Sequence, residues 1–156
     1  MEKTDALAYV YHDAGQIAEE YDHPCVTIEH ELLAAIGLIK AWSTKRLPRY
    51  LQLEATQNEI AETYALLNSH AMFSVGMTES FITESFEDGE FPDDGSEKTG
   101  DTAIDLVGMA EKNGGVATLP MMIEAMLRHP TALVHKCVLR EPPKTNNVKS
   151  FEDWFS

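Results

Sequence analysis

The chain has 156 residues, of which 44% are hydrophobic and 24% are charged. This size and composition suit one folded domain with a buried core, and they exclude a large multidomain enzyme, a collagen and a wholly disordered chain. The 26 acidic residues outnumber the 12 basic ones, so the net charge of -14 argues against nucleic acid and anionic membrane surfaces as partners.

The opening residues and the cysteines predict a cytoplasmic protein. No apolar run approaches the roughly 18 to 20 residues that cross a bilayer, and the first residues lack the basic and apolar regions of a signal peptide. Cys25 and Cys137 are too few for a disulfide framework and are expected to be reduced thiols. Nothing in the sequence implies a cofactor.

The first third of the chain predicts a helical hairpin. Apolar residues recur at spacings of three and four over residues 7–21, which defines one face of a helix. Residues 22–24 interrupt that helix. Thr27 then offers an N-cap oxygen to a second helix over residues 28–39.

The middle of the chain predicts one further helix. Residues 56–59, Thr-Gln-Asn-Glu, have the form of a capping box, which would begin a helix with Ile60, Tyr64 and Leu67 facing inward. Residues 69–85 fit a short helix or an extended segment, and the pattern leaves both open.

Residues 84–101 are the most acidic part of the sequence. They hold eight acidic residues against Lys98, so seven of the fourteen net negative charges lie here. Four glycine and proline residues interrupt the run: Gly89, Pro92, Gly95 and Gly100. This composition predicts a long, solvated and mobile loop. A functional alternative is that the loop steers basic partners toward the protein.

The last third predicts a second hairpin. A helix over residues 104–110 ends at the glycine pair 114–115, and Thr118 caps the next helix, over residues 122–127. His-Pro ends that helix, and Thr131 begins a last one. Because no stretch alternates as a strand does, the sequence predicts an all-α fold.

Three methionines share the predicted helix that follows Thr118. Met121 lies off the face that Met122 and Met126 define. In one interpretation Met121 is exposed and contacts a partner, as methionine does at adaptable binding surfaces. In the other, all three methionine side chains are buried in the core.

The two hairpins follow one pattern, which indicates an internal repeat. Ala18 in the first corresponds to Ala110 in the second, and the apolar block 32–36 corresponds to residues 123–127. The first copy reads Thr4-Asp5, two spaced alanines, His23, and then Thr-Ile-Glu-His-Glu-Leu-Leu over residues 27–33.

This first copy resembles the repeat of the Clp N-terminal domain, in which Thr-Glu, two alanines and Gly-His lead into Gly-Thr-Glu-His-x-Leu-Leu. The likeness covers residues 4–40 and is fainter over residues 100–141. It implies two pseudo-repeated four-helix units. It also implies a role in docking adaptors and substrate proteins, either at the front of a ring-shaped AAA+ unfoldase or as a stand-alone relative.

The resemblance also points to a binding site. Thr4 and Glu29 match residues that in some relatives line a pocket for phosphorylated arginine. Backbone donors at the start of the second helix would favour an anionic or carbonyl ligand. We therefore expect partner contacts at Thr4, Val26, Thr27 and Glu29, with no catalytic residue and no metal.

A rival interpretation uses His23, Cys25 and His30, with Glu29, as a zinc or catalytic site. The spacing fits no closed tetrahedral pattern, and the adjacent Glu29 and His30 point about 100° apart on a helix. In the structural interpretation His23 bonds to the backbone of the turn, Cys25 packs as a small hydrophobe, and Glu29 lies at a positive helix end.

The sequence thus predicts an all-α domain over residues 1–141, with helical repeats at 4–70 and 102–141 joined by the acidic insertion 84–101. Its expected function is protein binding without catalysis. Residues 142–156 are expected to be a linker or tail whose aromatic cluster is spaced to dock in a groove: Phe151, Trp154 and Phe155. A third interpretation is a structural protein that self-associates through the hairpins or this tail.

Overall fold

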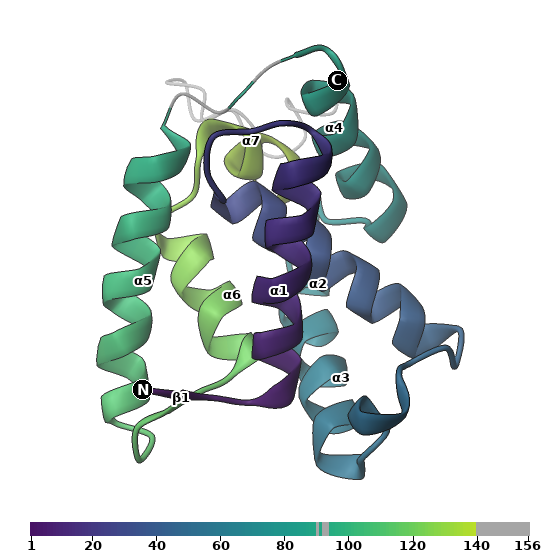
Figure 1. Cartoon of the computed structure of the whole chain (residues 1–156), viewed down its shortest axis with the longest axis vertical. Helices are drawn as coiled ribbons and strands as arrows, with labels where there is room; N and C mark the ends of the chain where they lie inside the picture. Colours follow the sequence, from purple (N-terminus) through teal and green to yellow (C-terminus); the bar gives the residue numbers. More distant parts are fainter. Residues whose placement is uncertain (90, 92–93, 140–156) are drawn as a thin grey trace, which may run out of the picture.

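The described part of the chain is mostly helical, as the sequence predicts. A computed structural model describes residues 1–89, 91 and 94–139, and Figure 1 shows their arrangement. The helices of these residues are α1 (Asp5–Glu20), α2 (Ile28–Ser43), α3 (Glu54–Asn68), α4 (Val75–Glu87), α5 (Gly95–Glu111), α6 (Leu119–Arg128) and α7 (Ala132–Val134). A 3₁₀ turn (Arg49–Leu51), a π-helical turn (His135–Leu139) and two short strands, β1 (Glu2–Lys3) and β2 (Val116–Ala117), complete them.

Helix α2 is the centre of the core. Eleven of its sixteen residues are buried, because α1, α3, α4 and α5 all contact it. Thr27 and His30 form the capping box that begins α2, which confirms the predicted N-cap. Helix α1 lies beside α2 (Figure 1) and buries the face that its apolar spacing predicts, including Leu7, Val10 and Ala14.

Helix α3 begins at Glu54, two residues before the predicted capping box. The box at residues 56–59 does not form, because Glu59 instead accepts hydrogen bonds from Thr4 Oγ1 (2.6 Å) and the Leu119 backbone N–H (2.7 Å). Ile60 and Leu67 are buried as predicted.

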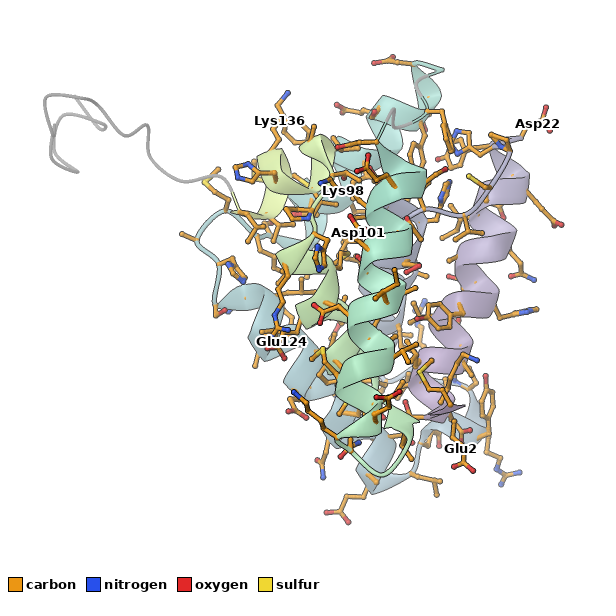
Figure 2. All side chains as sticks on the ribbon, turned by 90° about the vertical axis from the view of Figure 1, so that its left-hand side faces the viewer. Glu2, Asp22, Lys98, Asp101, Glu124 and Lys136 are labelled. Carbon is orange, nitrogen blue, oxygen red and sulfur yellow. The ribbon has the colours of Figure 1, made fainter. Side chains whose placement is uncertain are left out.

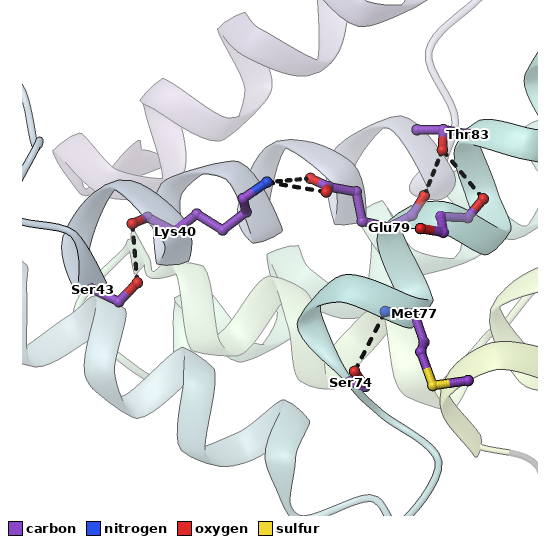
Figure 3. Close-up of polar contacts among 7 residues, drawn as sticks. Lys40, Ser43, Ser74, Met77, Glu79 and Thr83 are labelled. Carbon is purple, nitrogen blue, oxygen red and sulfur yellow. Dashed lines mark hydrogen bonds and ion pairs between the residues drawn. The ribbon is translucent and has the colours of Figure 1, made fainter.

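Helix α4 occupies the stretch whose conformation the sequence left open. Ser74 caps it by accepting from the Met77 N–H, and its buried face includes Ile82 and Phe86. Lys40 of α2 forms an ion pair with Glu79 of α4 at 3.0 Å, and this contact is drawn in Figure 3.

The prediction of an acidic loop over residues 84–101 is wrong for most of these residues. Helix α4 continues to Glu87, and α5 begins at Gly95, seven residues before the predicted start of the second repeat at residue 102. Tertiary contacts override the local composition here. Thr99 Oγ1 accepts from the Ile28 N–H at 2.9 Å, which fixes the first turns of α5 against the start of α2.

A two-residue parallel pairing was not predicted. Glu2 of β1 is in register with Val116 of β2, and the Thr4 N–H donates to the Ala117 oxygen at 3.0 Å. Two residues are too few to show an alternating pattern. The pairing fixes the start of α1 next to the turn between α5 and α6, where Gly114 and Gly115 have φ values of 68° and 83°.

The predicted caps of the last helices are confirmed. Thr118 and Thr131 accept hydrogen bonds from the backbone N–H groups of Met121 and Val134. The last predicted helix is not uniform, since α7 passes into the π-helical turn. The predicted tail and its aromatic cluster lie outside the described residues. In residues 1–89, 91 and 94–139, no helix combines the length and apolar character needed to cross a membrane.

Candidate functional site

The four predicted contact residues do not form one surface. Thr27 and Glu29 are fully buried in the first turn of α2, whereas Val26 and Thr4 are half-buried. Thr4 caps the far end of α1, whose sixteen residues span about 24 Å. The structure therefore separates Thr4 from Glu29 by the length of that helix.

Thr4 belongs to a junction of three helices. Its hydroxyl donates to Glu59 Oε2 from the start of α1, and the Leu119 N–H donates to the same oxygen from the start of α6. A carboxylate between two helix N-termini is favourable because both helix ends carry partial positive charge. This role of Glu59 was not predicted, because its partners are 55 and 60 residues away in sequence.

Glu29 lies where the starts of α2 and α7 meet. Burial raises its pKa, the nearby hydroxyls of Thr131 and Thr27 lower it, and the charge of Asp94 raises it further. Within the described residues, neither carboxylate oxygen makes a hydrogen bond of good geometry. Burying an ionised carboxyl that lacks such hydrogen bonds is costly, which is why burial is the largest cause of the raised pKa of Glu29.

Glu31 is a second buried carboxyl, two residues further along α2. Its exposed fraction is 5%, and burial, followed by the charge of Glu29, raises its pKa to about 8. Glu31 is therefore mostly protonated at neutral pH. The sequence gives no signal for this, because an acidic residue in the first turn of a helix is normally exposed.

His23 and His30 form a directed chain of hydrogen bonds. The Thr27 N–H donates to His30 Nδ1 at 2.8 Å, so this nitrogen carries no proton. The neutral ring then has its proton on Nε2, which lies 2.7 Å from His23 Nδ1 and donates to it. The prediction that His23 bonds to the backbone of the turn is therefore wrong, since its described partner is another imidazole.

The surroundings of both imidazole rings lower their pKa values. Burial, and then the proximity of His23, lowers the pKa of His30 to about 4, and burial also lowers the pKa of His23. Phe86 packs against both rings, at centroid distances of 4.7 Å from His23 and 5.0 Å from His30.

Cys25 does not join these histidines. Its side chain is exposed, contrary to the predicted packing, and its Sγ lies 3.3 Å from Ser96 Oγ at the start of α5. Among the described residues, no three His, Cys, Asp or Glu side chains gather as metal ligands would. Cys137 is buried, and burial raises the pKa of its thiol to about 12.

A wide hollow lies between α3, α5 and α6, and we call it the α3–α5–α6 groove. Its volume is about 860 Å³. The apolar side of its lining consists of Ala65, Leu66, Met109, Pro120 and Met121. Charged residues surround them: Glu62, Lys112, Glu124 and Arg128.

Met121 connects this groove to the sequence analysis. It is half-buried and lines the groove, whereas Met122 and Met126 are fully buried in the core. The off-face position of Met121 thus identified one lining residue. Leu66 and Met109 carried no such signal, because only the tertiary fold brings α3 and α5 to the same side of α6.

Comparison with known proteins identifies no relative of this chain. Searches against protein-family models, curated proteins and solved structures find no match to the chain.

Proposed function

We propose that this chain is a protein-docking module that presents adaptor or substrate proteins to a Clp-type ATP-dependent unfoldase and protease system. The resemblance of residues 4–40 to the Clp N-terminal repeat supports the choice of system. The observation that carries the docking role is the α3–α5–α6 groove, a hollow of about 860 Å³ lined by soft apolar side chains.

The lining of the groove suits varied protein segments. Met109 and Met121 are flexible and polarisable, so they adapt to side chains of different shape. Glu62 and Glu124 are balanced by Lys112 and Arg128, and Arg128 already pairs with Glu124 at 2.8 Å. We therefore assign the binding energy to apolar contact rather than to one sign of charge.

The predicted contact residues are less accessible to a partner than the groove is. Thr27 and Glu29 are fully buried, so a partner would reach them only if the α2 and α7 starts separated. Val26 and Thr4 are half-buried and accessible in part. The groove, by contrast, is open without rearrangement, and we place the first contact with a partner there.

The proposal is tested by affinity capture from a lysate of the source cells, with bound proteins identified and quantified by mass spectrometry. The wild-type chain is compared with Met121→Glu in the groove and with Met77→Glu as a matched control. Met77 lies on α4 with an exposed fraction of 68%, away from the groove. Circular dichroism verifies that both variants are folded.

We expect the wild type and Met77→Glu to recover subunits of an AAA+ unfoldase or its protease, or a known adaptor of such a system. Recovery with Met121→Glu should fall about tenfold, because a carboxylate placed among apolar contacts must be desolvated. Recovery of no such protein would refute the assignment to this system. Equal recovery by both variants would refute the groove as the docking site.

A further inference from the structure

The side of α5 that faces away from the core has an unusual sequence pattern. Glu97, Ile104 and Glu111 follow one another at intervals of seven residues, and Val107 lies on the same side, three residues after Ile104. We call these four residues the outer face of α5. Ile104 is 74% exposed and Val107 is 43% exposed, so the face presents two apolar side chains between two acidic ones.

Two shallow hollows adjoin the apolar centre of this face. One lies beside Ile104 and has a volume of about 300 Å³, with Asp101 and Asp105 in its lining. The other, of about 390 Å³, lies beside Val107 and is lined in part by Glu2 and Glu111. Figure 2 faces α5 and labels Asp101 on this helix and Glu2 on β1. Each hollow therefore combines an apolar side chain with two carboxyl groups.

Most of these carboxylates have no cation beside them. Asp105 is paired with Arg128 at 3.3 Å and with His129 at 3.4 Å. In the part of the chain that the structure describes, the side chains of Glu97, Asp101 and Glu111 form no ion pair or hydrogen bond. Helix α5 itself carries four acidic residues against one lysine.

We propose that the outer face of α5 docks a basic amphipathic helix of another protein. The apolar side chains of such a helix would cover Ile104 and Val107, and its Lys or Arg side chains would pair with Glu97 and Glu111. These two glutamates are fourteen residues apart, or about 21 Å along α5. The matching partner therefore carries basic residues two heptads apart, with apolar residues between them.

Charge selects this occupant over a second copy of the chain. A second α5 would bring the same acidic ends and a net charge of -14 against this face, which is repulsive. A basic helix would gain attraction at both ends and would bind faster at low ionic strength. The outer face of α5 contains no residue of the α3–α5–α6 groove, so this proposal does not rest on the proposed function.

The test uses the full chain and a fluorescent synthetic helix about 21 residues long, with Leu at its apolar positions and Lys at the outer heptad positions. A second peptide carries Glu in place of each Lys. Fluorescence anisotropy gives the dissociation constant of each peptide for the wild type, for Ile104→Ser and for the matched control Met77→Ser. Circular dichroism confirms the fold of each variant.

We expect the Lys peptide to bind and the Glu peptide to bind at least tenfold more weakly. Ile104→Ser should weaken the Lys peptide about tenfold, because the buried apolar contact is lost. Met77→Ser should leave the affinity unchanged. A double variant, Glu97→Gln with Glu111→Gln, should weaken binding and flatten its dependence on salt.

Three results would overturn the inference. The first is equal affinity for the Lys and Glu peptides, and the second is an affinity that Ile104→Ser and Met77→Ser change equally. The third is sedimentation showing a dimer of the wild type that Ile104→Ser dissolves, because a second copy would then be the occupant. Loss of capture through Met121 would not affect any of these measurements, so the two proposals fail separately.

Discussion

Replacing Glu31 by glutamine should change how the stability of this protein depends on pH. Burial raises the pKa of Glu31 from 4.5 to about 8, so the folded protein binds this proton more tightly than the unfolded chain does. The free energy of unfolding must then fall as the pH rises through this interval. Each unit of pKa difference is worth about 1.4 kcal/mol, so full ionisation would cost on the order of 5 kcal/mol.

This cost is large compared with the roughly 5 to 15 kcal/mol by which small domains are stable. Glutamine has nearly the same shape as protonated glutamic acid and does not ionise. We therefore expect Glu31→Gln to be close to wild type near pH 5 and more stable than wild type by several kcal/mol at pH 8 or above.

The assay is urea unfolding followed by far-ultraviolet circular dichroism at pH 5, 6, 7 and 8. Glu19→Gln serves as the matched control, because Glu19 is exposed on α1. The control should follow the wild type across the whole series. If the free energy of unfolding changed with pH in the same way for the wild type and Glu31→Gln, Glu31 would not bind a proton on folding. The reasoning from burial would then be wrong.

Three further substitutions test other contacts, each by urea or thermal unfolding. The pKa of His30 is lowered from 6.5 to about 4, so the free energy of unfolding should fall as the pH drops through this interval. His30→Gln keeps an acceptor for the Thr27 N–H and should reduce that loss. The same loss of stability at low pH in the wild type and in the variant would contradict this. Glu59→Ala leaves the Thr4 hydroxyl and the Leu119 N–H without their acceptor and should cost about 1 to 3 kcal/mol, whereas a neutral effect would mean that water replaces it. Gly108→Ala should stabilise α5 by about 0.5 to 1 kcal/mol, because a Cβ there meets nothing within 4 Å; destabilisation would show that the glycine is required.

Local signals predicted the helices well. Thr27, Thr118 and Thr131 each begin a helix as expected, because capping depends on residues within three or four positions of the cap. The all-α class followed from the same local periodicities. The internal repeat remains a prediction, although the α1–α2 and α5–α6 pairs that suggested it both pack as neighbours.

The failures involve contacts between residues distant in sequence. Residues 95–101 are helical, and in this helix Thr99 contacts Ile28, seventy-one residues earlier; the local composition contains no information about that contact. Glu59 was assigned to a local capping box but bonds to Thr4 and Leu119 instead. For the site, the sequence placed Glu29 among the partner contacts, whereas the packing of α2 and α7 buries it.

The pairing of β1 with β2 has a consequence for the order in which the protein is made. The chain leaves the ribosome from its N-terminus, so α1 and α2 are available early and can begin to pack on each other. Glu2, however, pairs with Val116, and Thr4 shares its glutamate with Leu119. Translation products that end before residue 116 therefore lack both of these contacts, and one side of their α1–α2 hairpin stays uncovered.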